Sequence, residues 1–112
     1  MTGKIDWERR RVNLRILMAA QGTNATKVAR AAGLSPNTLS QFTSGRTSYL
    51  SEKTLSKVLP LLGLSATEDL DTDNPLRDPR VAIRRFLDVI PDADLEELRL
   101  VLERKYPDLL KR

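Results

Sequence analysis

One stretch decides the fold: TNATKVARAAGLSPNTLSQFTSGR, from Thr23 to Arg46. Its first part, about Asn24 to Ala32, is rich in small helix formers and predicts a short helix that the following glycine ends. Its second part, about Pro36 to Ser44, predicts another, because the serine before it can cap a helix and proline at the first helical position needs no amide donor. The turn between them, GLS at residues 33–35, has the three-residue length that joins two helices at a large angle. We therefore predict a pair of short, closely packed helices.

The two predicted helices have an apolar inner side and a polar outer side. The residues expected to point inward are Val28, Leu34, Leu39 and Phe42, with small Ala29 where the helices come closest. The residues left outward on the second helix carry no charge: Pro36, Asn37, Thr38, Ser40, Gln41, Thr43 and Ser44. An ordinary solvated helix face more often carries Lys and Glu. The amides of Asn37 and Gln41 can pair with an adenine edge in the major groove of DNA, so this face predicts base contacts.

Two further helices are predicted on either side of this pair. Before it, the helical spacing of Leu14, Leu17 and Met18 predicts a helix from about Trp7 to Gln21. After it, Ser51 can cap a helix from Glu52 to Leu62 whose leucines also repeat at helical spacing. Proline disfavours a helix interior, so we expect a kink or an early end at Pro60. Trp7 is expected to pack rather than to stack on bases.

The C-terminal part predicts a linker and a helical hairpin. Residues 65–78 hold five acidic residues, two X-Pro steps and little periodicity, which is typical of a linker. Asp78 can cap a helix that starts at Pro79 and runs to Ile90. Asp94 and Glu97 have the spacing of a capping box for a last helix to about Lys105. No convincing strand is found, so the predicted fold class is all-α.

Composition limits the chemistry that the chain can perform. The 112 residues include no cysteine and no histidine, which removes disulfides, thiolate metal sites and the commonest general base, so no metal, cofactor or enzymatic activity is expected. The longest apolar run, Ile16 to Ala20, is too short to span a bilayer, and the first eleven residues lack an apolar signal region. We therefore expect a cytoplasmic protein without a membrane span.

Charge is unevenly distributed along the chain. The net charge of +4 combines +7 in residues 1–64 with −3 in residues 65–112. Such asymmetry favours a polyanion-binding part joined to a part with another role.

The residues of the first half resemble a known family. The matching positions are Gly33-Leu34-Ser35, Leu39-Ser40, Phe42, Ser44-Gly45-Arg46, Thr54-Leu55 and Leu62-Gly63-Leu64-Ser65. They are similar to the phage-repressor, or xenobiotic-response-element, helix-turn-helix family over about residues 12–65. The resemblance implies a lambda-repressor-like domain of four to five helices that binds palindromic double-stranded DNA operators as a dimer. Larger relatives add a self-cleaving peptidase domain, for which residues 66–112 have no room.

The same resemblance implies roles for individual residues. Base contacts are expected from Pro36, Asn37, Thr38 and Gln41, although proline cannot donate a hydrogen bond. Phosphate contacts are expected from Arg10, Arg11, Asn24, Lys27, Ser35, Ser40, Arg46, Thr47 and Ser48. Three alternatives remain: the amides of Asn37 and Gln41 are simply solvated, Arg46 caps the carbonyls that end its helix, and residues 9–11 form a solvated face.

A single helix-turn-helix contacts few base pairs, so a second copy is the usual way to lengthen the recognised site. We predict a DNA-binding domain at residues 1–65, an acidic linker at 66–78 and a hairpin at 79–112 that dimerises through its apolar stripes. Phe86, Leu87, Leu98 and Leu102 are expected at the centre of that interface. The alternative is that the stripes pack against each other or against the first helix.

The leading functional hypothesis is a sequence-specific transcription regulator, a dimeric repressor of phage or mobile-element type. A second hypothesis is an interaction protein, such as an antitoxin or antiactivator, that uses the same scaffold to bind a protein. A third, a Ser/Lys hydrolase, lacks any local motif that pairs the two residue types.

Overall fold

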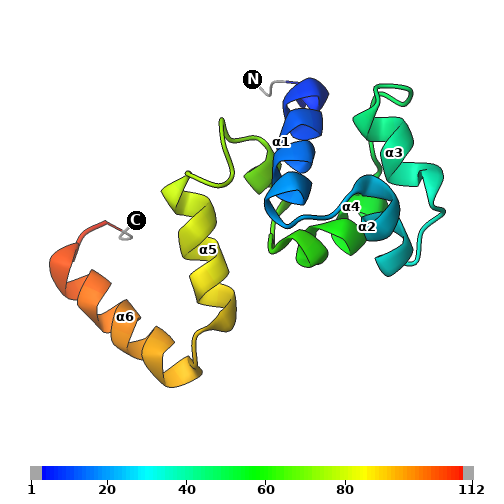
Figure 1. Cartoon of the computed structure of the whole chain (residues 1–112). Helices are drawn as coiled ribbons and strands as arrows, with labels where there is room; N and C mark the ends of the chain where they lie inside the picture. Colours follow the sequence, from blue (N-terminus) through cyan, green and yellow to red (C-terminus); the bar gives the residue numbers. More distant parts are fainter. Residues whose placement is uncertain (1–3, 110–112) are drawn as a thin grey trace.

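The computed structural model describes residues 4–109 and contains only helices within them (Figure 1). Six α-helices and two 3₁₀ helices follow one another: α1 (Trp7–Ala20), α2 (Ala25–Ala31), α3 (Asn37–Thr43), α4 (Glu52–Val58), η1 (Leu59–Leu62), η2 (Thr67–Leu70), α5 (Pro79–Val89) and α6 (Asp92–Lys105). The predicted all-α class is therefore confirmed. The outermost residues of the first and last predicted segments, 1–3 and 110–112, lie outside the described range. None of the helices in that range is long and apolar enough to cross a membrane.

One hydrophobic core lies among α1 to α4 and the two 3₁₀ helices. The residues predicted to be inward on α2 and α3 are in it: Val28, Ala29, Leu39 and Phe42 are buried, and Leu34 packs against the cluster. From the neighbouring helices come Leu14, Leu17, Leu55, Leu59, Leu62 and Leu70, which are also buried. Trp7 packs on the same core, with its ring edge-on to Phe42 at a centroid distance of 5.9 Å. Trp7 is thus a packing residue, as expected.

Side-chain caps and glycines set most of the helix ends, and the caps predicted at Ser51 and Asp78 are confirmed. The cap predicted at Ser35 is wrong, because α3 starts after Pro36 with no side-chain cap and the Ser35 backbone carbonyl accepts the Thr38 amide over 3.0 Å instead. The side chains of Asn24, Ser51 and Asp78 accept the first free amides of α2, α4 and α5. At the end of α2, Gly33 has a φ of +76°, in the left-handed region that only glycine adopts without strain. That conformation lets the Leu34 amide donate to the Ala29 carbonyl over 2.8 Å, which closes the turn into α3.

Proline residues alter two helices. The α-helical geometry of α4 stops at Val58, and the chain continues as the 3₁₀ helix η1, which contains Pro60. The expected early end is therefore confirmed. By contrast, α6 begins at Asp92, two residues before the expected cap at Asp94. This earlier start depends on the backbone, because the Pro91 carbonyl accepts the Asp94 and Leu95 amides and no side chain caps the helix.

Residues 66–78, here called the bridging segment, are packed on α1 instead of forming the loosely held linker that we expected. The segment contains η2, with Leu70 fully buried. Asn13 Nδ2 donates to the Leu70 and Thr72 carbonyls over 2.8 and 2.7 Å. Nε and Nη2 of Arg10 donate to the two oxygens of Asp71 over 2.7 and 3.0 Å. Two of the acidic residues that suggested solvation from sequence, Asp71 and Asp73, are therefore partners for Arg10 and Arg9 of α1.

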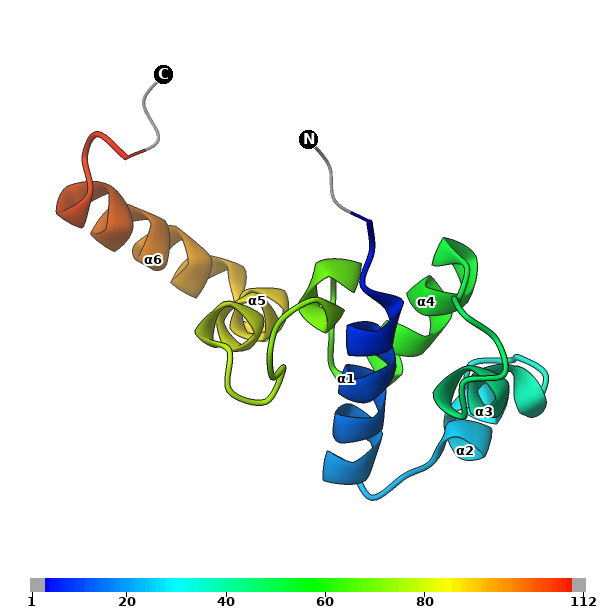
Figure 2. The same ribbon diagram turned by 90° about the horizontal axis from the view of Figure 1, so that it is seen from above.

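The two C-terminal helices extend away from this core (Figures 1 and 2). Val81, near the start of α5, is buried in the core cluster, whereas α6 has no buried residue. The described part of the chain is accordingly elongated, with extents of 49 × 35 × 23 Å. Apart from Val81, most large apolar residues of the hairpin are exposed in this single chain, among them Ile83, Phe86, Leu87, Val101 and Leu102.

Candidate nucleic-acid interface

The outer face of α3 presents amide groups to solvent. Asn37 and Gln41 are exposed, and they lie one helical turn apart. The hydroxyl groups near them are directed to the helix backbone: Ser40 Oγ donates to the Asn37 carbonyl and Ser44 Oγ to the Gln41 carbonyl, each over 3.2 Å. Thr38 is half-buried beside them. The amides are thus the polar groups on this face that are best placed to contact another molecule.

A tight turn closes the C-terminal end of α3. The amides of Arg46 and Thr47 both donate to the Gln41 carbonyl, over 2.8 and 3.1 Å. Gly45 makes this possible with a φ of +88°. Backbone amides, rather than the Arg46 guanidinium, therefore satisfy that carbonyl, and the Arg46 side chain is exposed at the edge of the α3 face.

Arg11 of α1 binds the backbone at the C-terminal end of α3 and does not lie on the outer face of that helix. Its side chain is buried, with 8% of its surface exposed. Nε donates to the Phe42 carbonyl over 2.6 Å, Nη2 donates to the Thr47 carbonyl over 3.1 Å, and the guanidinium lies 4.8 Å from the centre of the Phe42 ring. A further ion pair joins it to Glu8. The expected phosphate contact is therefore not met by the position of Arg11.

Arg10 is also too buried to contact a DNA phosphate. Only 4% of its surface is exposed, and both oxygens of Asp71 accept from it. The hydrogen bond to Asp71 raises the pKa of Arg10 above its ordinary value, although burial acts in the opposite direction. The expected phosphate contact of Arg10 is thus replaced by an internal ion pair. Nor do residues 9–11 form a free solvated face, because Arg9 pairs with Asp73.

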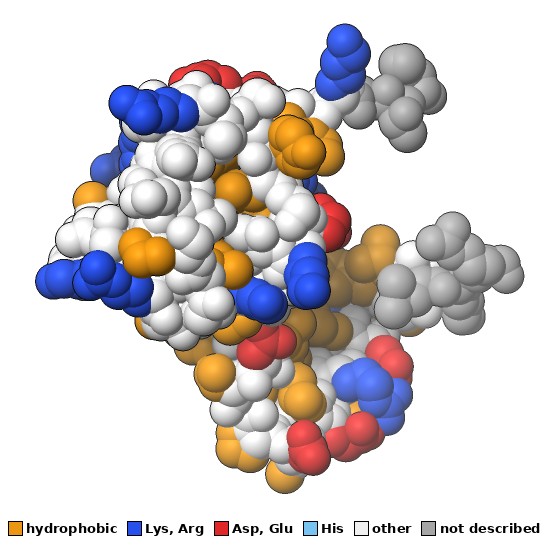
Figure 3. Space-filling model, turned by 90° about the vertical axis from the view of Figure 1, so that its right-hand side faces the viewer, with side chains coloured by type: hydrophobic (Ala, Val, Ile, Leu, Met, Phe, Trp, Pro, Cys, Tyr) orange, Lys and Arg blue, Asp and Glu red, His pale blue; other side chains and the backbone are white. Residues whose placement is uncertain are grey.

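The other predicted phosphate-binding residues lie on α2, on α3 or in the segments directly before and after these helices. Asn24, Lys27, Ser35, Arg46, Thr47 and Ser48 are exposed, and Ser40 is half-buried. Asn24 Oδ1 accepts the Lys27 amide over 2.9 Å, so the start of α2 is already capped by its own side chain. Figure 3 shows Lys and Arg side chains at the border of a broad area of uncharged surface.

Arg15 is a surface cation that the sequence reasoning did not select. It is exposed on α1, and its Nη2 donates to the Thr43 carbonyl near the end of α3. A shallow hollow of about 490 Å³ lies beside it, and its lining includes Arg15, Asn24, Ser40, Thr43 and Ser44. No local signal in the sequence distinguishes exposed Arg15 from Arg11, which lies one helical turn earlier and is buried.

Comparison with known proteins identifies the class of domain. Residues 13–75 match the model of the Cro/C1-type helix-turn-helix DNA-binding domain, and the chain belongs to that family. The match extends beyond the predicted boundary at residue 65 and includes most of the bridging segment. That agrees with the packing of this segment on α1.

One solved structure is similar over nearly the whole chain. It is the clp gene regulator ClgR from Corynebacterium glutamicum, at 26% sequence identity. The alignment covers 95% of this chain and 99% of that one, with a TM-score of 0.51. No curated protein matches the chain.

Proposed function

We propose that this protein is a sequence-specific double-stranded DNA-binding transcription regulator in which α3 is the recognition helix. The observation that carries the proposal is the pair of exposed amides on α3, in a domain of the Cro/C1-type DNA-binding family. The similarity to a gene regulator over almost the whole chain supports the regulatory role. DNA recognition of this kind needs no reactive side chain and no cofactor.

The proposed docking places α3 in the major groove. The amides of Asn37 and Gln41 then hydrogen-bond to base edges, with adenine the best geometric partner. Thr38, at the half-buried edge, supplies an apolar contact to a thymine methyl group or a hydrogen bond to phosphate. Pro36 can contribute only packing, because its nitrogen carries no hydrogen.

Phosphate contacts are proposed at the border of the α3 face. Exposed Lys27 on α2 and exposed Arg46 after α3 would supply the positive charge, together with exposed Arg15, which reaches the end of α3 from α1. Asn24, Ser35, Ser40, Thr47 and Ser48 provide the neutral contacts. Such contacts fix the register of the protein on the duplex without distinguishing sequences.

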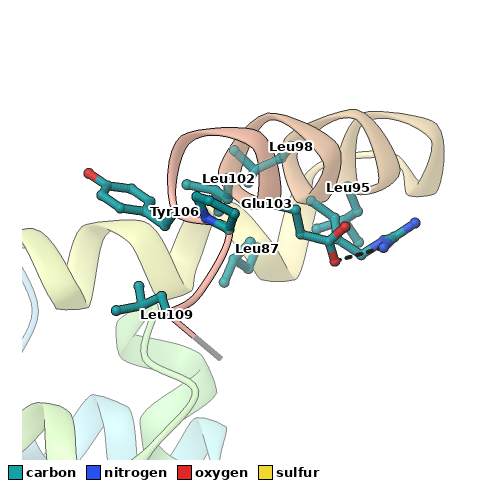
Figure 4. Close-up of a pocket in the computed structure, with 9 residues that line it drawn as sticks. Leu87, Leu95, Leu98, Leu102, Glu103, Tyr106 and Leu109 are labelled. Carbon is teal, nitrogen blue, oxygen red and sulfur yellow. Dashed lines mark hydrogen bonds and ion pairs between the residues drawn. The ribbon is translucent and has the colours of Figure 1, made fainter. Parts of the chain in front are cut away.

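Dimerisation through the C-terminal hairpin is proposed from its uncovered apolar surface. Phe86 is 64% exposed, and Leu87 and Leu102 are also exposed. A groove of about 690 Å³ runs along the inner side of the hairpin (Figure 4), lined by Leu87, Leu95, Leu98, Arg99, Leu102, Glu103, Tyr106, Pro107 and Leu109. An isolated helix of about this length is marginally stable in water, so α6 needs a partner surface. A second copy supplies it and brings two recognition helices to one palindromic operator.

Repression is the proposed outcome of binding, because a dimer on a promoter excludes other proteins from that DNA. The resemblance to phage repressors supports this choice. A promoter–reporter fusion tests this proposal when it carries an operator selected by the protein from a random pool of DNA duplexes. Expression of the reporter is expected to fall when the protein is present. A rise in expression would contradict repression while leaving DNA binding intact.

Salt dependence of binding to random duplex DNA distinguishes this function from a protein-binding role. The logarithm of affinity is expected to fall linearly with the logarithm of salt concentration. Arg46→Ala is expected to make this dependence shallower, with the magnitude of the slope smaller by about one. Arg104→Ala, which removes the same charge from α6, is the matched control and should leave the slope unchanged. Absence of salt-dependent binding by the unmodified protein would favour the antitoxin or antiactivator hypothesis.

A further inference from the structure

The bridging segment is a rigid connection between the DNA-binding helices and the hairpin. On one side, Asn13 and Arg10 of α1 hold Leu70, Asp71 and Thr72 by four hydrogen bonds. Because Arg11 of the same helix bonds the backbone at the end of α3, the segment is fixed relative to the recognition helix as well.

On the other side, an ion pair between buried Asp69 and half-buried Arg84 joins the bridging segment to α5. Asp69 is only 1% exposed, and its Oδ1 accepts Nε of Arg84 over 2.8 Å and Nη2 over 2.5 Å. Asp69 Oδ2 is buried without a hydrogen-bond partner among the described residues. A buried carboxylate is costly unless it is paired, so Arg84 is held at this one position.

Further contacts fix the direction of α5. Val81 enters the core one turn before Arg84, and the Thr72 hydroxyl donates to Asp78 at the N-terminal cap. The Arg85 guanidinium lies against Gly63, where an added Cβ would approach it to 3.1 Å. Contacts on several sides of the first two turns prevent α5 from rotating freely about the end of the bridging segment.

We infer that Asp69 and Arg84 are positioning residues that set the spacing between the two half-sites of the operator. The inference rests on the proposed dimeric DNA-binding function. Two recognition helices must lie about 34 Å, or one turn of DNA, apart to occupy successive major grooves. If the hairpins join the two copies, the distance between recognition helices follows from the angle of α5 on the DNA-binding domain. The Asp69–Arg84 pair holds that angle.

A series of duplexes with different half-site spacings tests this inference. Two copies of the selected half-site are separated by the natural spacer, or by one or two base pairs more or fewer, and affinity is measured by fluorescence anisotropy. The unmodified protein is expected to lose on the order of tenfold in affinity at each altered spacing. Asp69→Ala/Arg84→Ala removes the ion pair without leaving a buried charge, and the remaining contacts of α5, such as that of Val81 in the core, leave a weak residual preference for spacing. It is expected to bind all spacings within about threefold of one another, with unchanged affinity for a single half-site.

Arg80→Ala is the matched control, since it removes an exposed arginine from α5 and should keep the unmodified profile. If the double variant does not fold, Asp69→Asn/Arg84→Gln replaces it, because this pair of carboxamides also leaves no buried charge and keeps polar side chains at both positions. A folded, dimeric variant that keeps the unmodified spacing profile would overturn the inference, as would an unmodified protein with no spacing preference. If the unmodified protein binds no duplex at all, the proposed function itself fails, and the inference fails with it.

Discussion

At the scale of single residues, Gln41 is the clearest test of base recognition. Gln41 is exposed on α3, so its side-chain amide is free to contact a base, while its backbone carbonyl accepts the amides of Arg46 and Thr47 in the turn that follows. Gln41→Ala is expected to cost about 1–3 kcal/mol of binding free energy on the selected operator and almost nothing on random duplexes. Anisotropy titrations on both kinds of DNA measure this difference. An equal loss on both would assign Gln41 to phosphate binding instead.

Arg11 is expected to affect stability rather than DNA binding. Arg11→Met retains much of the packing on Phe42 but removes the guanidinium hydrogen bonds to the Phe42 and Thr47 carbonyls, so that the Phe42 carbonyl keeps only the Gly45 amide. Hydrogen bonds that involve a charged group contribute about 1.5–3 kcal/mol each, so the urea midpoint of unfolding should fall clearly. The salt slope of binding to random DNA should stay unchanged. A shallower salt dependence of DNA binding with an unchanged urea midpoint would instead show that Arg11 contacts phosphate.

At the scale of elements, the sequence predicts local features well and distant pairings poorly. The end of α2 at its glycine, the caps of α4 and α5 and the change at Pro60 depend on neighbouring residues, and the structure agrees with them, whereas the serine cap expected at the start of α3 is not formed. The packing of the bridging segment depends on pairs such as Arg10 with Asp71, which are 61 positions apart. Five acidic residues without periodicity are typical of a solvated linker, so no local signal separates the two cases.

The dependence on distant partners also explains why the phosphate contacts predicted for Arg10 and Arg11 were wrong. The exposed positions on α3 could be predicted because helical periodicity decides which residues face outward. The burial of Arg10 and Arg11 could not, because basic residues near an N-terminus are ordinarily solvated. Only the three-dimensional placement of the Phe42 carbonyl and the Asp71 carboxylate gives them partners.

The N-terminal cap of α5 predicts a specific response to acid. The hydrogen bond from Thr72, followed by that from the Arg80 amide, lowers the pKa of Asp78 below its ordinary value of 3.8. Because the pKa is lower in the folded state, Asp78 stabilises the fold above the ordinary pKa, and this contribution disappears as the pH falls through the lowered one. Urea unfolding at pH 6 and at progressively lower pH values should therefore show a smaller acid-induced loss for Asp78→Asn. Identical acid sensitivity of the two proteins would contradict this role.

At the scale of the whole molecule, the uncovered hairpin predicts association. Leu98→Glu/Leu102→Glu should convert a dimer into a monomer in sedimentation experiments, because carboxylates in the apolar groove oppose its burial. The helical core should remain folded, since α6 contributes no buried residue to it. Leu61→Glu, a change at an exposed leucine outside the hairpin, is the control and should leave the dimer intact. A monomeric unmodified protein at micromolar concentration would contradict the proposed interface.

The distribution of charge supports the same division of roles. The +7 half contains the recognition helix and the cations around it, and the −3 half contains the hairpin. Part of the acidic surplus is directed inward, since Asp69 and Asp71 pair with Arg84 and Arg10. The remainder is expected to keep the hairpin away from the phosphate backbone, which would leave its apolar face for the proposed second copy.

Selection of bound duplexes from a random pool tests the central claim most directly. If α3 reads base edges in a dimer, the unmodified protein should enrich one short motif that occurs twice as an inverted repeat, about one helical turn apart. The same selection with Asn37→Ala/Gln41→Ala should lose the motif while still retaining DNA at low salt. A pool that remains random after selection with the unmodified protein would contradict the claim that this chain recognises a DNA sequence.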